Sequence, residues 1–320
     1  MTEHKNEAVV VDASAASKLA LRSVAMPAPR EHEALVRVTT ISLNRGEINR
    51  ALNSAPDGWR PGWDLAGVVE RAAANGSGPT SGTKVVGFMP EGAWARFVAV
   101  PTDSLAPIPD GATLAQAATL PVAGLTALYS LRQGGLLLGK KVLITGATGG
   151  VGDFALQLAR LSGAAAIVAH LRGARHEAEV RAAGATSVVI GDTPAAAISE
   201  GPFDLIADGV GGEVLGAALG MLATDGVCVC FGASASGQTT FDQLAFFRAG
   251  RARLYGLSLY AELRSGENAS IALSRLLRLV AAGTLKPRIS VEAPWQQVGR
   301  VARELIDRRF TGKAVLHLDA

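Results

Sequence analysis

The sequence predicts an α/β protein in which a doubly wound parallel sheet is combined with a second, mostly β domain. Short β-type runs separated by Gly, Pro, Asn and Asp fill the first 110 residues. From residue 142 onward, strand-like runs alternate with helix-like segments, which is typical of a parallel sheet. A glycine-rich turn, ITGATGGVG at 144–152, joins the first of those strands to the first of those helices.

The N-terminal part shows little helical periodicity. Turn-forming residues at short spacing indicate a compact, mostly β domain, such as a partly open barrel. The expected strands are 8–11, 34–38, 67–69, 84–88 and 94–100.

The middle of the chain changes character. Segment 113–132 has helical character, but Pro121 lies inside it and should break or kink the helix. The alternation that follows predicts strands at 142–145, 166–170, 187–190, 204–207, 226–231 and 253–257, with helices at 151–161, 174–183 and 213–222.

The last part of the chain begins with an amphipathic segment at 269–282. A strand at 289–291, a helix at 298–308 and a final strand at 314–318 are expected after it. We expect the final strand to return to the N-terminal domain.

Composition excludes several classes of protein. The excess of 31 Lys+Arg over 28 Asp+Glu is small, and no run of like charge suggests a nucleic-acid tract. The N-terminus lacks the apolar core of a signal peptide, and the longest apolar stretch, 117–129, is too short to span a bilayer. Cys228 and Cys230 stand too close in sequence for a good disulfide. We expect a cytoplasmic protein that binds neither nucleic acid nor membrane.

The glycine-rich turn predicts a site for the phosphates of a dinucleotide. Glycines at 149 and 150 let the backbone approach a pyrophosphate, and Gly152 allows tight packing of helix on strand. The N–H groups of the first helical turn would face the anion. Ala147 replaces the first glycine of GxGxxG, so the motif alone also fits an ordinary turn. The expected binding residues are Thr148, Gly149, Gly150, Val151 and Gly152.

Two enzyme families have nearly the same sequence in this turn. The short-chain dehydrogenases have TGxxxGxG near the N-terminus and rely on a Tyr-x-x-x-Lys pair. Here the turn follows about 140 residues of another domain. No tyrosine has a lysine four residues later, since Tyr129, Tyr255 and Tyr260 are followed there by Gln133, Leu259 and Arg264.

Residues 119–152, TLPVAGLTALYSLRQGGLLLGKKVLITGATGGVG, closely resemble the medium-chain dehydrogenase/reductase superfamily, in particular its quinone oxidoreductase (zeta-crystallin-like) branch. PGWDLAGV, DLIADGVGG, GVCVCFGA and TGKAVL resemble the same family, so the likeness covers the whole chain. It implies a GroES-like catalytic domain at 1–118 and 287–320 and a Rossmann domain at 119–286. It also implies a homodimer, for which the edge strand near 253–257 offers an unpaired backbone.

The end of the second strand of the Rossmann domain favours NADPH. An enzyme that prefers NAD usually carries Asp or Glu there, but this strand ends at His170 and no acid follows until Glu177. Arg172 and Arg175 stand where a 2′-phosphate would bind, and arginine grips phosphate well. The alternative is that both are ordinary solvated residues. The family often carries a Tyr after the third strand, where this chain has Gly191.

No metal is expected. By the resemblance, Asn44 occupies the position of a zinc-binding Cys and Trp63 that of a His, and the structural four-Cys lobe is missing. Without a Lewis acid, reduction is easiest for conjugated acceptors such as quinones and α,β-unsaturated carbonyls. Hydrogen-bond donors of the protein can stabilise the charge that develops there.

The resemblance also implies substrate-site residues. It places Asn44, Glu47 and Asn49 at the cleft between the domains, with Asn44 as a possible donor to a carbonyl or as a simple turn cap. Asn49 departs from the family, which often has Tyr nearby, so the proton would come from solvent or from a residue such as Tyr260. Asp64 would anchor the loop.

Further residues are implied near the cofactor. Thr126 resembles a Thr that contacts the nicotinamide, although it could equally bond back to a helix carbonyl. Lys313 would reach the cofactor or pair on the surface. The segment Phe231, Gly232 and Ala233 ends a strand where dinucleotides lie.

Three functions remain open from the sequence. The leading one is a zinc-free, NADPH-dependent reductase of quinones or activated enones. The second is a reductase of a ketone or of an enoyl intermediate in a biosynthetic pathway. The third is a cofactor-binding protein with little turnover.

Overall fold

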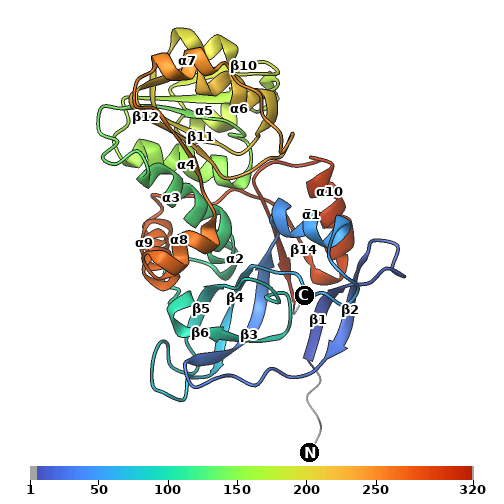
Figure 1. Cartoon of the computed structure of the whole chain (residues 1–320). Coiled ribbons are helices and arrows are strands. Elements are labelled where there is room, and N and C mark those ends of the chain that lie inside the picture. The colour runs from blue at the N-terminus through green and yellow to red at the C-terminus, as the bar shows by residue number, and fades with distance from the viewer. Residues whose placement is uncertain (1–5, 319–320) are drawn as a thin grey trace, which may run out of the picture. The chain divides into compact units, whose positions relative to one another are not determined.

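The computed structural model describes residues 6–318. The chain forms two compact units (Figure 1): Met1–Leu125 together with Leu263–Ala320, and Thr126–Glu262. The first is built around antiparallel strands and the second around a parallel sheet. The predicted α/β class, with a doubly wound sheet and a mostly β part, is confirmed.

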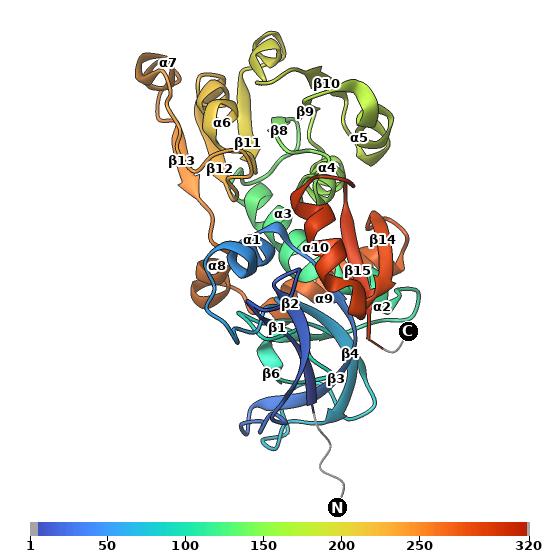
Figure 2. The same cartoon turned by 90° about the vertical axis from the view of Figure 1, so that its right-hand side faces the viewer.

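The first unit contains a seven-stranded sheet in the order β14-β15-β3-β4-β5-β7, with β6 paired to β3, and a separate β1–β2 hairpin. Figure 2 shows β14 and β15, from the end of the chain, beside strands from its beginning. The predicted return of the last strand is confirmed. The strands are β1 (Asn6–Val11), β2 (Leu19–Val24), β3 (Glu33–Ser42), β4 (Asp64–Arg71), β5 (Lys84–Phe88), β6 (Phe97–Pro101), β7 (Leu105–Pro107), β14 (Ile289–Pro294) and β15 (Lys313–His317).

Strand β3 organises this unit because it pairs with β15, β4 and β6. The approach of β3 to β4 is close at Gly67, where a Cβ atom would lie 2.1 Å from the carbonyl oxygen of Arg37. Only glycine fits there. The core beneath is apolar and includes the fully buried Trp94 and Trp295.

Helices α1 (Arg45–Asn53), α2 (Leu114–Ala118), α9 (Ala269–Ala281) and α10 (Val298–Ile306) belong to the same unit. The sequence placed segment 269–282 in the Rossmann domain, whereas α9 packs against β5 and β7 of the first unit. Its buried face is Ala272, Leu273, Leu276, Leu277 and Val280. Periodicity predicts such an apolar face but not the sheet that receives it.

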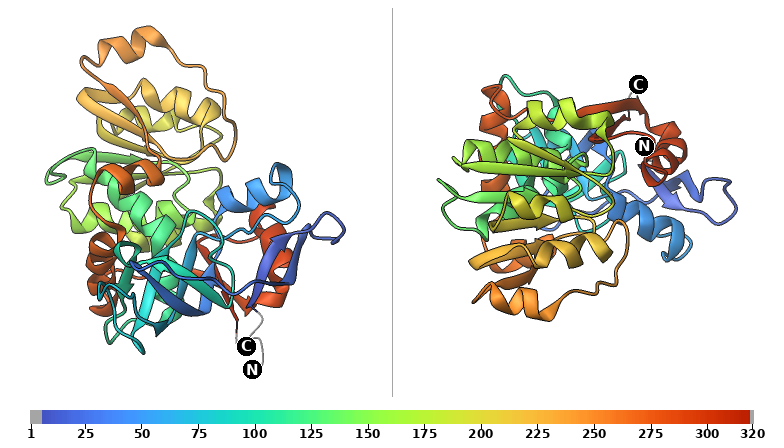
Figure 3. Two further views of the ribbon diagram at one scale, coloured as in Figure 1. Left: turned by 60° about the horizontal axis from the view of Figure 1, so that its bottom comes forward. Right: turned by 90° about the horizontal axis from the view of Figure 1, so that it is seen from above.

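The second unit is a six-stranded parallel sheet in the order β10-β9-β8-β11-β12-β13. Strand order proceeds outward from β8 in one direction and from β11 in the other, so right-handed crossovers place helices on both faces, as Figure 3 shows. Its elements are α3 (Leu125–Arg132), β8 (Lys141–Ile144), α4 (Gly150–Leu161), β9 (Ala166–Leu171), α5 (Glu177–Ala183), β10 (Ser187–Ile190), β11 (Phe203–Asp208), α6 (Gly212–Leu219), β12 (Leu222–Cys230), α7 (Gln243–Arg248), β13 (Arg253–Gly256) and α8 (Leu259–Ser265).

Two predicted helices differ from the structure. Segment 113–132 is interrupted by a wide π-type turn at Leu120–Gly124, because Pro121 has no N–H to donate. The helix expected at 213–222 ends at Leu219, and β12 already begins at Leu222. Within residues 6–318, no helix combines the length and apolar character needed to cross a membrane.

Candidate substrate and cofactor sites

Four polar side chains from distant parts of the sequence meet inside the first unit. Asn44 is the N-cap of α1, Glu47 lies in its first turn, Asp64 begins β4 and Lys313 begins β15. We call these four residues the buried polar cluster. The side chains of Glu47 and Asp64 are 0% exposed, and Lys313 and Asn44 are also buried.

Lys313 is the internal cation of this cluster. Its Nζ donates to the carbonyl oxygen of Leu43 (2.9 Å) and to Oδ1 of Asn44 (2.5 Å), and lies 3.4 Å from Oδ2 of Asp64. The ammonium therefore ties β15 to the segment after β3 and to the start of β4.

The amide of Asn44 is fully used within the cluster. Its Nδ2 donates to Oε1 of Glu47 (3.0 Å) and to Oδ2 of Asp64 (2.8 Å), while Oδ1 accepts from Lys313. The backbone N–H of Asn44 also donates to Oε1 of Glu47 (2.8 Å), which closes a capping box. With both amide hydrogens engaged, Asn44 in this arrangement has no donor left for a substrate carbonyl.

The cluster holds two carboxyl groups and one ammonium. Burial, and then the charge of Asp64, raise the pKa of Glu47 well above its ordinary value. Burial also raises the pKa of Asp64, while Lys313 and the N–H groups of Asn44 and Val122 oppose that shift. Oε2 of Glu47 is buried without a hydrogen-bond partner. A proton on Glu47 makes the cluster electrically neutral, which a buried site favours.

This geometry bears on the roles expected from the sequence. Glu47, Asp64 and Lys313 lie beneath the surface, so they are placed to position Asn44 rather than to touch a substrate. Lys313, which the resemblance placed either at the cofactor or in a pair on the surface, is buried in the polar cluster. Asn49 is exposed on α1. The ring of Trp63 packs on the backbone of Gly46, where a Cβ atom would lie 2.8 Å from it.

The phosphate turn of the second unit has the predicted strand-to-helix context. It follows β8 and leads into α4, whose N-cap is Gly149 with no side-chain cap. Gly146 has φ +61°, and a Cβ atom on Gly152 would lie 2.4 Å from the carbonyl oxygen of Gly146. The turn closes tightly and leaves the first N–H groups of α4 to face an anion. Thr148 and Val151 lie in this turn as predicted.

A buried bond links this turn to the neighbouring strand. Oγ1 of Thr145 donates to Oδ1 of Asp208 (2.5 Å), and Oδ2 of Asp208 accepts from the N–H of Gly211 (2.9 Å). Burial raises the pKa of Asp208, and these hydrogen bonds oppose the rise. The ends of β8 and β11 are thereby fixed together, which holds the shape of the phosphate turn.

The end of β9 presents two arginines to solvent. Arg172 and Arg175 are exposed, and among the described residues neither has a hydrogen-bond or ion-pair partner. His170 is different: it is buried, and its Nε2 lies 2.8 Å from the carbonyl oxygen of Gly191. Burial lowers the pKa of His170, which favours a neutral ring. His170 therefore shapes the turn after β9 rather than offering its ring to a ligand.

The remaining predicted residues lie at strand or helix ends of the second unit. Phe231, Gly232 and Ala233 follow β12, and a Cβ atom on Gly232 would lie 2.9 Å from the carbonyl oxygen of Gly209. Thr126 is buried in the first turn of α3. Within the second unit, these residues therefore lie at the carboxyl end of the sheet or in α3.

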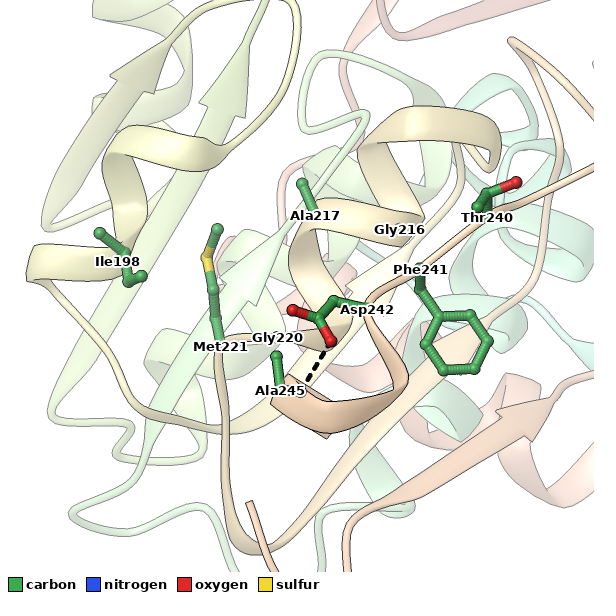
Figure 4. Close-up of a pocket in the computed structure, with 9 residues that line it drawn as sticks. All are labelled: Ile198, Gly216, Ala217, Gly220, Met221, Thr240, Phe241, Asp242 and Ala245. Carbon is green, nitrogen blue, oxygen red and sulfur yellow. Dashed lines mark hydrogen bonds between the residues drawn. The ribbon is translucent and has the colours of Figure 1, made fainter. Parts of the chain in front are cut away.

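Metal-binding groups are not assembled in the described part of the chain, since no three or more His, Cys, Asp or Glu residues there gather in a suitable arrangement. The surface of the second unit has a mostly apolar hollow between α6 and the start of α7 (Figure 4), where Asp242 caps α7. A second hollow lies on the first unit beside α9. Neither is lined by a residue that the sequence assigned to a site.

Two features of these sites were not assigned from the sequence. The first is the hydrogen bond between Thr145 and Asp208. Both residues lie in motifs that the sequence shows, the glycine-rich turn and DGVGG, but they are 63 positions apart, so the sequence does not show that they are in contact. The second is the burial of Lys313, which had no such signal, because positions 313 to 316 are all buried and the alternation of side chains along β15 does not distinguish an inner from an outer face.

Comparison with known proteins agrees with both units. Residues 30–110 match the family described as "Alcohol dehydrogenase GroES-like domain" and residues 182–316 match "Zinc-binding dehydrogenase". The first match lies in the unit that holds the buried polar cluster, which identifies that unit as GroES-like.

Individual proteins resemble the chain over most of its length. A mycocerosic acid synthase-like polyketide synthase of Mycobacterium tuberculosis is 30% identical over 91% of this chain and 14% of the synthase. Prostaglandin reductase-3 of Bos taurus is 27% identical over 93% of this chain and 84% of that protein. A mycobacterial protein solved in complex with NADPH has the same fold, with a TM-score of 0.87, 24% identity and coverage of 98% of this chain and 99% of that one.

The chain spans only part of several relatives. It covers 14%, 39% and 8% of the lengths of the first three curated proteins that it matches. Two of these three are synthases of much greater length.

Proposed function

Since this chain belongs to the medium-chain dehydrogenase/reductase superfamily of oxidoreductases, we propose that it is an NADPH-dependent reductase of activated substrates. The substrates are α,β-unsaturated carbonyl compounds or quinones. One observation carries the proposal: an amide and an indole stand where a metal-dependent relative would need ligands, and an internal ammonium contacts the amide. Asn44 and Trp63 supply no thiolate or imidazole, and Lys313 places a positive charge 2.5 Å from Asn44.

The residues of the second unit fit a dinucleotide with a 2′-phosphate. The tight turn at Gly149–Gly152 leaves uncapped N–H groups at α4 for the pyrophosphate. Arg172 and Arg175 are exposed, unpaired cations just after β9. NADPH bound there supplies a hydride to the substrate.

The protein's own part is to bind, orient and stabilise. The buried polar cluster fixes the backbone from Leu43 to Glu47, so this segment presents a rigid surface to the substrate. Asn49 and Trp63 are the more accessible side chains beside it. Because Glu47 is fully buried, solvent or an accessible donor delivers the proton that completes reduction.

A second candidate is an enoyl reductase of a biosynthetic pathway. It is supported by the 30% identity with a polyketide synthase over 91% of this chain. An enoyl thioester is itself a conjugated acceptor, so both candidates share one chemistry and differ in the group attached to the carbonyl.

We also propose a cytoplasmic homodimer. Two free cysteines agree with a reducing compartment. Strand β13 is at the edge of its sheet, and Leu254 is 47% exposed there. The N–H of Leu257 and the C=O of Tyr255 face β12, so by alternation the backbone groups of Leu254 face outward and are open to another strand.

The test is oxidation of NADPH with a naphthoquinone, an α,β-unsaturated ketone, an enoyl thioester and a simple ketone. Turnover of the conjugated acceptors with little reduction of the ketone is expected. A preference for the thioester would favour the biosynthetic role. Preference for the simple ketone would overturn the proposal, and tight NADPH binding without turnover of any acceptor would indicate a cofactor-binding protein.

A further inference from the structure

Arginines that are half-buried in this protein have partners, with one exception. Of five such arginines in the described chain, Arg37 lies 3.5 Å from Glu70, Arg45 donates to the carbonyl oxygen of Leu305, Arg96 lies 3.2 Å from Glu7 and Arg288 donates to Thr311. The side chain of Arg60 has neither a hydrogen bond nor an ion pair within residues 6–318.

The surroundings of Arg60 leave its charge incompletely balanced. Its Nε is buried without a partner, and burial lowers the pKa of its guanidinium, with Glu91 opposing the shift. Glu91 is near enough to attract Arg60, but its Oε2 accepts from Nε1 of Trp59 (2.8 Å). Arginine is seldom buried unless it is paired, and each buried group without a partner calls for an explanation.

The loop that carries Arg60 is held firmly. The N–H of Gly92 donates to the carbonyl oxygen of Arg60 (3.0 Å), and the N–H of Val11 donates to that of Trp59 (2.8 Å). The guanidinium of Arg50 stacks 4.4 Å from the ring of Trp59. The residue before Arg60 is thus fixed by its own contacts, on a scaffold that does not need to be ordered by a ligand.

Arg60 is also close in sequence to Asp64 of the buried polar cluster. Asp64 lies four positions further along the chain, so the two Cα atoms are at most about 14 Å apart. Between them, Trp63 packs on Gly46 next to Asn44. A guanidinium at this distance can bind one end of an extended molecule whose other end lies against the segment at Asn44.

We propose that Arg60 binds an oxyanion of the substrate, a carboxylate or a phosphate remote from the conjugated carbonyl. The proposal rests on the reductase function above and names the class of substrate. The planar fork of arginine donates two parallel hydrogen bonds to either oxyanion. An anion bound here gives Arg60 the partner that Glu91 does not provide. Arg60 therefore favours negatively charged substrates over neutral ones.

The experiment uses one enone in three forms that differ only at the far end: a neutral methyl ether, a carboxylate and a phosphate. Arg60→Met should lower kcat/KM for the charged forms, relative to the neutral form, about tenfold to hundredfold, which is the range for a hydrogen bond to a charged group. Arg60→Lys should recover part of this, because it keeps charge without the fork. Arg71→Met, which removes an exposed cation from the end of β4, should keep the wild-type ratio.

Binding of the saturated carboxylate and phosphate, measured by calorimetry, tests Arg60 without turnover. Loss of this binding in Arg60→Met would support the anion site even if the reductase function failed. Whichever of the two, carboxylate or phosphate, binds the wild type more tightly identifies the preferred oxyanion. An unchanged ratio and unchanged binding in Arg60→Met would overturn the proposal, as would a rise confined to the KM for NADPH.

Discussion

At the scale of single residues, Lys313 helps to fix the side-chain amide of Asn44. The ammonium holds Oδ1 of Asn44, and the carboxyl groups of Glu47 and Asp64 hold its Nδ2. The amide is therefore a structural centre in this arrangement. Removing one member leaves another buried polar group without its partner, which usually costs about 3–5 kcal/mol when that group is charged.

Glu47→Gln should make stability less dependent on pH. The pKa of Glu47 is raised in the folded protein above its ordinary 4.5, so the folded chain binds this proton more tightly than the unfolded chain. The wild type therefore has the full contribution of this group below pH 4.5 and loses it as the pH rises toward the folded pKa. Glutamine keeps an oxygen for Asn44 and cannot ionise.

Urea unfolding at several pH values between 4.5 and 8 checks this prediction. Glu47→Gln should become more stable relative to wild type as the pH rises: its free energy of unfolding minus that of the wild type should increase. The exposed Glu31→Gln serves as a control that should not show the trend. A difference between Glu47→Gln and wild type that stays constant with pH would contradict a proton on Glu47.

Arg172 and Arg175 should distinguish the two nicotinamide cofactors. Replacing both by alanine removes the exposed cations that would hold a 2′-phosphate, a group absent from NADH. We expect the KM for NADPH to rise at least about tenfold and far more than the KM for NADH. Steady-state kinetics with both cofactors measures this, and equal effects would remove the support for NADPH.

Some residues of the candidate site could be predicted from the sequence and others could not. Sequence reasoning could identify Asn44, Glu47 and Asp64, since the resemblance aligns them with positions of known type. It could not foresee that they face inward, because that depends on Lys313, which lies 269 positions from Asn44. Arg60 gave no signal at all, since an unpaired arginine is unusual only once its burial and neighbours are known.

At the scale of elements, the phosphate turn depends on the fit between Gly146 and Gly152. A Cβ atom at position 152 would lie 2.4 Å from the carbonyl oxygen of Gly146 and 2.6 Å from the Cα of Ala147. Both contacts are with backbone, so the start of α4 would have to move away from β8.

Gly152→Ala should therefore weaken NADPH binding at least about tenfold, because the N–H groups of α4 lose their common direction. Fluorescence titration with NADPH measures the loss. Gly237→Ala is a matched control, since a Cβ atom there meets nothing within 4 Å. Wild-type affinity in Gly152→Ala would show that the turn tolerates a wider geometry.

Elements with strong patterns were predicted well from the sequence. The alternation of strand and helix gave the sheet of the second unit, and the glycine-rich turn gave the start of α4. Helix α1 was not predicted, because its apolar face consists of only Ile48, Ala51 and Leu52 in a nine-residue segment. The π-type turn at Leu120–Gly124 could be expected only as a break at Pro121, since its geometry depends on neighbours such as Asp64, which accepts from the N–H of Val122.

At the scale of the whole molecule, both ends of the chain contribute to one sheet. Strand β15 pairs with β3, and β14 with β15. The buried polar cluster also joins distant parts of the chain, because Lys313 comes from the last strand and its partners come from the first 64 residues. Folding of the first unit therefore requires the chain on both sides of the second unit.

The homodimer is tested at this scale. Leu254→Lys should weaken association, because a two-fold pairing of β13 strands would bring two added charges close together. The control Leu136→Lys changes a leucine that is more exposed but lies in the loop before β8. Light scattering after size exclusion should give a dimer for wild type and control and a smaller species for Leu254→Lys. A monomeric wild type, or a dimeric Leu254→Lys, would remove the edge-strand interface.

The internal ammonium has a further consequence for redesign. Grafting Cys at position 44 and His at position 63 would supply the side chains of a zinc-dependent relative, yet Lys313, whose Nζ lies 2.5 Å from Oδ1 of Asn44, would remain beside position 44. Two positive charges that close in a poorly hydrated site repel strongly. Converting this scaffold to metal catalysis therefore takes at least three substitutions, and the third, at Lys313, lies in β15.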